Sequence, residues 1–331
     1  MDRLILAIET SCDETAAAVT QGRRVIGNAV YTQKEHEKYG GVVPEIASRN
    51  HIVKLPYIVD EALHAAGAKF ADIGAVAVTD GPGLIGALLV GVSYAKGLSY
   101  YLGCPLIPVH HIEGHICSLY ISHPDLEPPF LCLVVSGGHS HIAVVEDYGH
   151  YRLLGKTRDD AVGEAFDKTA RALGLKYPGG PNLERLAGEG QPVYRYPRGF
   201  RSESHLDFTF SGLKTAVINH MHNMEQKGEA YSKADIAASF QTEAVAFLAD
   251  NTFEAAARTG IKQVGIAGGV SANGALRAEF ERRAQQVGIS LYLPEMRYCT
   301  DNAAMIGCAA SFAQECAEPL RLNADASKML F

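Results

Sequence analysis

The sequence lacks the features that mark several common classes of protein. Its seven cysteines are odd in number and form no C-x-x-C pair, which excludes a disulfide framework and a zinc ribbon held by thiolates. Basic residues are in the minority, 30 against 37 acidic ones, so the net charge of −7 argues against a protein that coats nucleic acid by itself. The most apolar stretch, 84–98, contains Lys96 and several glycines and is too short to span a bilayer. Only five apolar residues precede Glu9, so we expect no signal peptide.

The composition is typical of a folded, globular protein. Hydrophobic residues make up 47% of the chain and charged residues 20%, which supplies real cores and excludes a disordered or fibrous protein. At roughly 100–200 residues per domain, a chain of 331 residues predicts two domains. The absence of disulfide patterns favours a reduced, cytoplasmic setting.

Short apolar runs alternate with helical patterns, which predicts mixed or parallel sheets flanked by helices. We expect strands at 4–9, 16–20, 75–79, 106–110, 130–136 and 264–267. We expect helices from the glycine-rich turn near 83 to about 98, and at 157–173, 234–258 and 273–287. The segment 177–181, Tyr-Pro-Gly-Gly-Pro, is predicted to be irregular.

The two halves of the chain repeat one order of features. Each has a strand that ends in a hydroxyl-rich turn, at 9–13 and at 136–140. Each later has a strand that leads through a glycine-rich turn into a helix, at 80–83 and at 268–273. The order predicts an α/β, actin-like duplicated fold of the Hsp70 and sugar-kinase type, with two halves facing a cleft. We expect the halves at 1–108 and 109–302, with a helical insertion at about 157–232 and a helix at about 303–325 that packs back on the first half.

Glycine turns between strands and helices let backbone N–H groups approach a phosphate. The turns at 134–138 and 264–273 have this form, although each taken alone is equally typical of a tight turn. The segment 81–86 matches the dinucleotide pattern G-x-G-x-x-G. That pattern also requires an acidic residue at the end of the next strand, and none occurs before Glu113, so we disfavour a nicotinamide site.

His111 and His115 form the most specific chemical signal. On a helix, residues four apart project from one face, so both imidazoles can bind one metal ion. The plain alternative is a pair of polar residues at the end of a buried strand. A carboxylate is needed to complete a site, and Asp301 is the best candidate, although an Asp before a helix is often an ordinary N-cap.

A metalloprotease is disfavoured by spacing. In H-E-x-x-H the Glu directly follows the first His, whereas Glu113 stands two residues after His111. It would therefore point about 200° away around a helix. No G-x-S-x-G nucleophile motif is present, and Cys12 has no activating base nearby in the sequence.

The simplest interpretation of the remaining charged residues is that they lie on solvent-exposed faces of helices. Within the helical pattern at 157–173, Asp167 is the one acid we keep as a candidate for a ligand hydroxyl or amine. Two arginine clusters could contact phosphates, although surface charge is the simpler interpretation. They comprise Arg195, Arg198 and Arg201, and Arg277, Arg282 and Arg283.

Ten segments, taken together, resemble a known family. They are IETSCDET (8–15), YGGVVPEIASR (39–49), GPGLIGALLVG (81–91), PVHHIEGH (108–115), VSGGH (135–139), GEAFDK (163–168), YPGGP (177–181), FSGLKT (210–215), AGGVSAN (267–273) and CTDNAAMI (299–306). In this order they are similar to the bacterial tRNA N(6)-adenosine threonylcarbamoyltransferases, also called the TsaD or glycoprotease family. The resemblance covers nearly the whole chain.

The resemblance implies an actin-like fold and an acyl transfer from threonylcarbamoyl-AMP. The acceptor would be the exocyclic amine of the adenosine 3′ to the anticodon, in tRNAs that read codons beginning with A. His111, His115 and Asp301 match the family's metal ligands, with iron(II) the usual metal and zinc an alternative. Substrate or adenine-nucleotide binding falls on Val134, Val135, Ser136, Gly137, Gly138, Asp167, Gly180 and Asn273. At Glu184 family members often have Asp, so we assign it no role.

Two other classes of function stay open: an actin-fold kinase or ATPase, and a non-catalytic nucleotide-binding scaffold. The resemblance further implies partner subunits, a TsaB-like paralogue and a TsaE-like ATPase. Together with the net charge of −7, this predicts that partners supply much of the affinity for tRNA.

Overall fold

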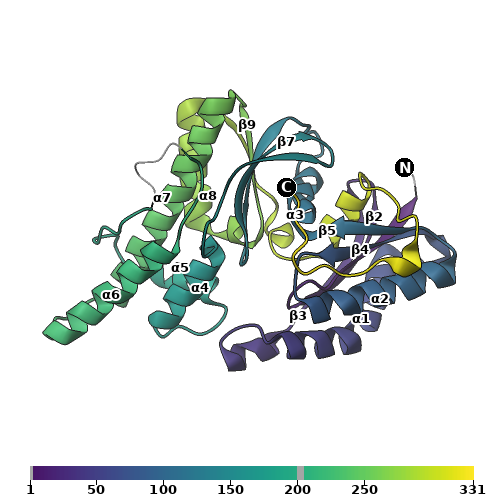
Figure 1. The fold of residues 1–331 in the computed structure, drawn as a ribbon, viewed down its shortest axis with the longest axis horizontal. Helices are drawn as coiled ribbons and strands as arrows, with labels where there is room; N and C mark the ends of the chain where they lie inside the picture. The colour runs from purple at the N-terminus through teal and green to yellow at the C-terminus, as the bar shows by residue number, and fades with distance from the viewer. Residues whose placement is uncertain (1–2, 200–204) are drawn as a thin grey trace. The chain divides into compact units, whose positions relative to one another are not determined.

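The computed structural model describes residues 3–199 and 205–331, which form two compact units (Figure 1). Unit 1 comprises Met1–Glu127 and Pro294–Phe331, and unit 2 comprises Pro128–Leu293. The boundaries expected from the sequence were 108 and 302. Helix α3 (His111–Ser122) packs against α9 (Ala303–Ala310), and both belong to unit 1. Across the described residues, no helix is both long enough and apolar enough to cross a membrane.

Unit 1 is built on a five-stranded sheet in the order β3-β2-β1-β4-β5. Strand β1 pairs antiparallel with β2 and parallel with β4, which in turn pairs parallel with β5. The strands are β1 (Leu4–Glu9), β2 (Glu14–Gln21), β3 (Arg24–Thr32), β4 (Ile73–Gly81) and β5 (Leu106–His110). The other elements are η1 (Lys34–Tyr39), α1 (Pro44–Ala66), η2 (Phe70–Asp72), α2 (Ile85–Leu102), η4 (Met296–Tyr298) and η5 (Pro319–Arg321).

The two faces of this sheet serve different purposes. Successive side chains of a strand alternate between faces, and Leu6 and Ile8 of β1 belong to the apolar core that includes side chains of α1 and α2. Glu9 therefore faces the other side of the sheet. The β1–β4 register pairs Ile8 with Val78, so Glu9 is neighbour to Thr79. Helix α9 packs on β1 and β2, and Gly307 permits this because a Cβ there would lie 2.4 Å from the hydroxyl of Thr20.

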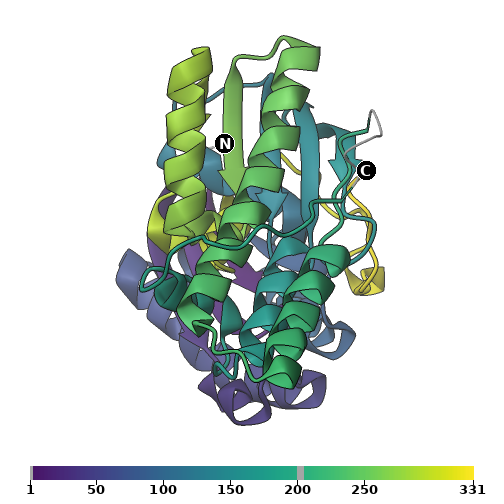
Figure 2. The same ribbon diagram turned by 90° about the vertical axis from the view of Figure 1, so that its left-hand side faces the viewer.

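Unit 2 repeats the same sheet topology. Its strands follow the order β8-β7-β6-β9-β10, with β6–β7–β8 antiparallel and β9 and β10 parallel to β6. The strands are β6 (Phe130–Val135), β7 (Ser140–Asp147), β8 (His150–Lys156), β9 (Gln263–Ala267) and β10 (Ser290–Tyr292). The helices are α4 (Val162–Ala172), α5 (Gly179–Ala187), α6 (Ser211–Lys227), α7 (Lys233–Thr259), η3 (Gly269–Ala272) and α8 (Gly274–Val287). Figure 2 shows the long green helix α7 with the yellow-green α8 packed beside it.

The shared topology agrees with the repeated order of features in the sequence. Strands β1 to β5 correspond one by one to β6 to β10, and α2 and α8 each follow the fourth strand of their unit. Between β8 and β9, unit 2 carries α4, α5 and α6 before α7, whereas unit 1 has only α1 and two short 3-10 turns between β3 and β4. These three helices lie within the segment 157–232 that the sequence singled out.

Three local predictions were wrong. The segment 177–181 is not wholly irregular, because α5 begins at Gly179; Gly and Pro are tolerated in a first helical turn, whose N–H groups need no intrahelical partner. The helix expected from 157 begins only at Val162, since Asp159 instead accepts hydrogen bonds from the backbone of Phe210 and Ser211. The helix expected to reach about 325 ends at Ala310, and the chain turns back so that the Cys316 N–H bonds the Leu106 carbonyl.

Candidate functional site

Helix α3 brings the two histidines of unit 1 onto one face. It starts directly after β5, and His110 caps it by accepting the Ile112 N–H at 3.1 Å. His111 and His115 are both buried, and their ring centroids lie 4.7 Å apart. Gly114, between them, lets α9 approach, because a Cβ there would lie 2.7 Å from the Ile306 side chain.

Asp301 completes the cluster. Its Oδ1 lies 3.2 Å from His115 Nε2 and 3.6 Å from His111 Nε2. The N-cap of α9 is the next residue, Asn302, which accepts the Met305 N–H, so Asp301 is not used as a cap. One ligand atom from each of His111, His115 and Asp301 lies within 4.8 Å of the others, as a shared metal ion requires.

The surroundings of His115 test whether a metal fits. Both of its ring nitrogens are buried and make no hydrogen bond to the described residues. His115 Nε2 faces the Asp301 carboxylate without hydrogen-bond geometry. A buried imidazole without hydrogen bonds is costly, and a cation bound at Nε2 removes that cost. Two imidazoles and one carboxylate form a donor set that suits iron(II) or zinc.

A fourth residue of this site, Glu9, was not predicted. Its Oε2 lies 3.1 Å from His111 Nδ1 and accepts the Thr79 hydroxyl at 2.6 Å, and its Oε1 accepts the Ser11 N–H. Burial alone would raise the pKa of Glu9, but His111 outweighs it and lowers that pKa. Burial alone would lower the pKa of His111, but Asp301 and then Glu9 outweigh it and raise that pKa to about 9. The sequence signal that could have identified Glu9 was an acidic residue at the end of a strand predicted to be buried.

Neighbouring groups exclude a cysteine nucleophile and a zinc protease. Burial, together with Asp13, raises the pKa of Cys12 well above its usual value, so this thiol stays protonated and a poor nucleophile. Because residues 111–122 are helical, Glu113 points about 200° away from His111. The carboxylates that do lie near His111 are those of Glu9, at the end of β1, and Asp301, just before α9.

In unit 2, the predicted substrate-binding residues lie on four segments that contact one another in a ring. The turn 134–138 contacts the chain directly after β9, where a Cβ on Gly268 would lie 2.4 Å from the Val135 carbonyl. It also meets the start of α4, where a Cβ on Gly163 would lie 2.6 Å from the Ser136 carbonyl. Further along α4, Asp167 accepts the Gly180 N–H of α5 at 3.0 Å.

The start of α8 closes this ring. Glu184 of α5 accepts the Gly274 N–H at 2.6 Å. Asn273 caps α8 through Leu276 N–H and donates its amide to Gln241 of α7 at 2.9 Å. Glu184, to which the sequence assigned no role, thus joins α5 to the start of α8.

The glycines of the ring fall into two kinds. Gly163, Gly179 and Gly268 are required for packing, because a Cβ on each would come within 2.7 Å of another atom. A Cβ on Gly137, Gly138 or Gly180 would meet nothing within 4 Å, and none of these three has a positive φ. These glycines therefore leave open space beside the backbone where a ligand can approach.

Four of the six residues in the two arginine clusters form ion pairs. Arg198 bonds Glu243 at 2.6 Å and Asp250 at 2.5 Å, and Arg195 reaches Glu243 at 3.4 Å. Arg282 and Arg283 share Glu279, and Arg283 also bonds Asp250. Arg277 donates to the Ser271 carbonyl, whereas Arg201 lies outside the described residues.

Asp159 and Asp160, which we expected on a solvent-exposed helix face, also form specific interactions. Asp159 accepts the Phe210 N–H at the start of α6, and Asp160 forms ion pairs with Lys168 at 2.8 Å and with Lys214 at 2.7 Å.

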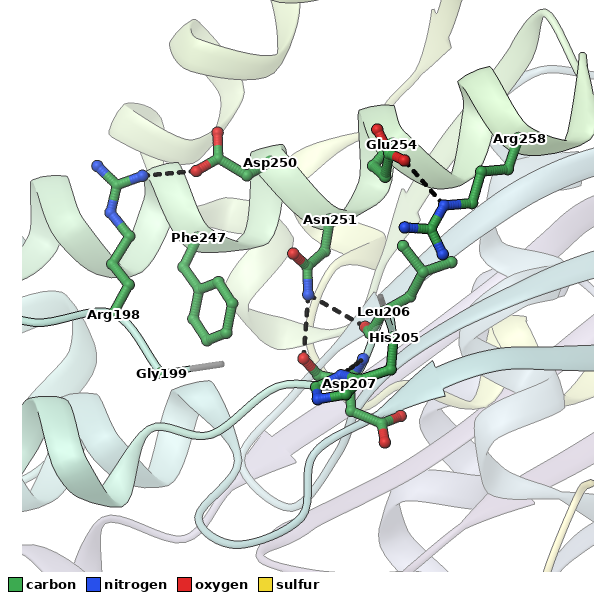
Figure 3. A pocket seen from close by; sticks show the side chains of 10 residues that line it. All are labelled: Arg198, Gly199, His205, Leu206, Asp207, Phe247, Asp250, Asn251, Glu254 and Arg258. Atoms are coloured by element: carbon green, nitrogen blue, oxygen red, sulfur yellow. Dashed lines mark hydrogen bonds and ion pairs between the residues drawn. The ribbon is translucent and has the colours of Figure 1, made fainter. Parts of the chain in front are cut away.

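A cavity of about 300 Å³ lies elsewhere in unit 2, between α7 and the residues 198–199 and 205–207 (Figure 3). Its rim carries the Arg198–Asp250 and Arg258–Glu254 ion pairs, and Asn251 donates to the carbonyls of Leu206 and Asp207. No predicted site residue lines it.

A family model described as TsaD, tRNA N6-adenosine threonylcarbamoyltransferase, matches residues 24–308. The chain belongs to this family. A Clostridium perfringens protein named tRNA N6-adenosine threonylcarbamoyltransferase is 54% identical over 313 residues, covering 94% of this chain and 92% of the relative. A Clostridium botulinum protein of the same name is 53% identical over 311 residues, covering 93% and 92%.

Solved structures confirm the actin-like fold of this family member. T. kodakarensis HypF aligns with a TM-score of 0.63 at 14% identity, and it covers 93% of this chain. The chain spans about half of that protein's length, 47%. A Streptomyces griseus ROK family glucokinase, solved with glucose and AMPPNP, aligns with a TM-score of 0.50 at 11% identity over 94% of this chain and 99% of that one.

Proposed function

We propose that this chain transfers a threonylcarbamoyl group from threonylcarbamoyl-AMP to the N6 amine of the adenosine 3′ to the anticodon of tRNA. The observation that supports this most directly is the convergence of His111, His115 and Asp301 in a member of this transferase family, with neither buried nitrogen of His115 hydrogen-bonded to the described residues. We assign these three residues to one iron(II) ion.

The donor in this reaction is already activated, because an adenylate has a good leaving group. No covalent enzyme intermediate is needed, which agrees with the protonated Cys12 thiol. The metal, when bound, supplies a Lewis acid for the carbonyl oxygen of the transferred group. The protein's own residues must bind the donor, orient its carbonyl carbon toward the amine and exclude water.

We assign binding of the adenylate to the ring of unit 2. Its open glycines Gly137, Gly138 and Gly180 present backbone without side chains, which suits close approach of a phosphate. Asp167 holds the Gly180 N–H and thereby the start of α5, and Asn273 holds the start of α8. Val134, Val135 and Ser136 form the strand end and turn that carry Gly137.

We further propose that the chain works in the cytoplasm with a TsaB-like paralogue and a TsaE-like ATPase. Its net charge of −7 and its paired arginine clusters supply little free positive charge for tRNA. Apolar side chains exposed on α1 and α2 offer unit 1 a surface for a protein partner; they are Ile52, Val53, Tyr57, Ile85 and Leu89.

Reconstitution tests this function directly. The chain is incubated with threonine, bicarbonate, ATP, the adenylate-forming enzyme, tRNA and the partner proteins, and the digested tRNA is analysed for modified nucleosides. His115→Ala should bind the metal too weakly to purify with it and should lose transfer, whereas Glu113→Gln, on the same helix, should keep both. Full transfer by metal-free His115→Ala protein contradicts the metal assignment. Steady ATP hydrolysis without tRNA supports a kinase or ATPase, and nucleotide binding without turnover supports a scaffold.

A further inference from the structure

Glu9 is a buried carboxylate whose side chain lies against one of the proposed metal ligands. It is the last residue of β1, is fully buried and contacts His111, which is distant in sequence but adjacent in space. The sheet register fixes this position, because β1 and β4 pair in parallel and place Glu9 beside Thr79. The position is therefore set by the fold rather than by a mobile loop.

The hydrogen bonds around Glu9 determine which nitrogen of His111 keeps its proton when a metal ion binds the other. An ionised carboxylate only accepts, so the Thr79 hydroxyl, the Ser11 N–H and His111 Nδ1–H must all be donors to it. With the proton held at Nδ1, the other nitrogen, Nε2, is the one that can bind a metal. Nε2 is also the nitrogen that faces Asp301, at 3.6 Å.

His115 has no equivalent partner. Its Nδ1 makes no hydrogen bond to the described residues, so packing alone orients this ring. The two histidines thus differ: one is oriented by a carboxylate and the other is not.

We propose that Glu9 is a positioning residue that orients His111 and fixes its tautomer for metal binding, with Thr79 and Ser11 holding the carboxylate in turn. This inference rests on the metal site of the proposed function. A carboxylate hydrogen-bonded to a metal-bound histidine raises the basicity of the ligand and fixes its ring, and its loss usually lowers metal affinity.

The test is a metal titration of the full-length chain with cobalt(II) in competition with a chelator, followed by the visible absorption of the bound ion. Glu9→Gln should lower cobalt affinity by about 10- to 100-fold and alter the absorption bands. Thr79→Val, which removes one of the hydrogen bonds that hold the carboxylate, should lower cobalt affinity in the same direction but by less than Glu9→Gln does. Unchanged affinity and bands in Glu9→Gln would overturn the proposal.

A double-mutant cycle distinguishes a role of Glu9 in orienting His111 from a general loss of structure at the site. Glu9→Gln should have no further effect on cobalt affinity in a His111→Ala background, but its full effect in a His115→Ala background. Equal effects in both backgrounds contradict the proposal. If Glu9→Gln does not fold, Glu9→Asp decides, because shortening the carboxylate should also weaken binding and a wild-type affinity would overturn the inference. A wild-type chain that binds no metal refutes the proposed function itself, whereas loss in His115→Ala without loss in Glu9→Gln refutes only the role of Glu9.

Discussion

The two units share one sheet topology but build chemically opposite sites at equivalent places. In unit 1 the turn after the first strand starts with Glu9, whose buried side chain supports a histidine. In unit 2 the equivalent turn, after β6, carries Gly137 and Gly138, which offer open backbone. The end of the first strand thus carries a buried side chain beside the proposed metal ligands in one unit, and in the other it is followed by open backbone where we propose that an anion binds.

The pKa values of several acidic residues also differ between the two units. In unit 1, burial raises the pKa of Asp80 although Lys328 opposes it, and burial raises that of Glu14 well above its usual value. In unit 2, burial would also raise the pKa of Asp160, but Lys168 and Lys214 outweigh it and lower that pKa. Desolvation thus dominates the pKa of Asp80 and Glu14 in unit 1, although not that of Glu9, whereas two lysines dominate the pKa of Asp160 in unit 2.

The largest expected effect comes from the two kinds of glycine in unit 2. Gly268→Ala places a Cβ 2.4 Å from the Val135 carbonyl at a φ of +92°, so we expect unit 2 to lose about 3 kcal/mol or more of stability. Gly137→Ala meets no atom within 4 Å and should change stability by less than about 0.5 kcal/mol, yet weaken adenylate binding. Denaturant unfolding and nucleotide titration measure the two effects. Equal destabilisation by both variants would remove the distinction between packing and ligand-facing glycines.

A buried ion pair of unit 1 gives the next effect. Lys328 Nζ lies 2.7 Å from both oxygens of Asp80, whose side chain is 8% exposed. Lys328→Met leaves that carboxylate without its cation and should cost about 2 kcal/mol. Asp80→Asn in the same chain should recover part of the loss, as thermal unfolding can show. If the double variant is no more stable than Lys328→Met, the buried charge is not the cause.

Several elements that build the candidate site could be predicted from the sequence, because their signals are local. The strands at Leu4–Glu9 and Leu106–His110 and the helix start at Asn273 follow from period and capping chemistry. The helix that carries His111 and His115 was only one of two possibilities that the sequence left open. The contact between Glu9 and His111 depends instead on the register of three strands. No local pattern encodes that register, so the acid was noticed only as part of a polar turn.

The alternatives that the sequence left open were decided by tertiary contacts. For Asp301 an ordinary N-cap was the alternative to a metal ligand, but Asn302 takes the cap and leaves the Asp301 carboxylate facing the histidines. For the arginine clusters surface charge was the simpler interpretation, and Glu243, Asp250 and Glu279 from α7 and α8 form ion pairs with four of these arginines. Each outcome depends on which residue a neighbouring element supplies.

The pKa of His111 predicts how metal affinity changes with pH. Because that pKa is raised to about 9, from about 6.5 in the unfolded chain, the metal-free protein gains stability from the protonated ring below about pH 6.5 and loses it as the pH rises through about 9. Metal binding must displace the proton from Nε2, so cobalt affinity should rise about tenfold per pH unit between pH 7 and 9. A chelator-competition titration at several pH values measures the slope. His111→Ala is the control, and its cobalt affinity should depend less steeply on pH. An equal slope in both proteins would show that the displaced proton comes from another group.

The smallest effect is expected where charge is already balanced. Arg282 shares Glu279 with Arg283, so Arg282→Gln should change the affinity of the isolated chain for tRNA by less than about threefold. If Arg282 instead contacts a phosphate, its loss should reduce the slope of log affinity against log salt by about 0.9. Fluorescence anisotropy with labelled tRNA over a salt series measures both quantities. We expect weak, salt-sensitive binding by the chain alone and an unchanged slope in the variant, since a cation paired with a neighbouring acid releases few counterions from RNA. Tight, salt-insensitive binding by the isolated chain would instead show that this subunit needs no partner to hold tRNA.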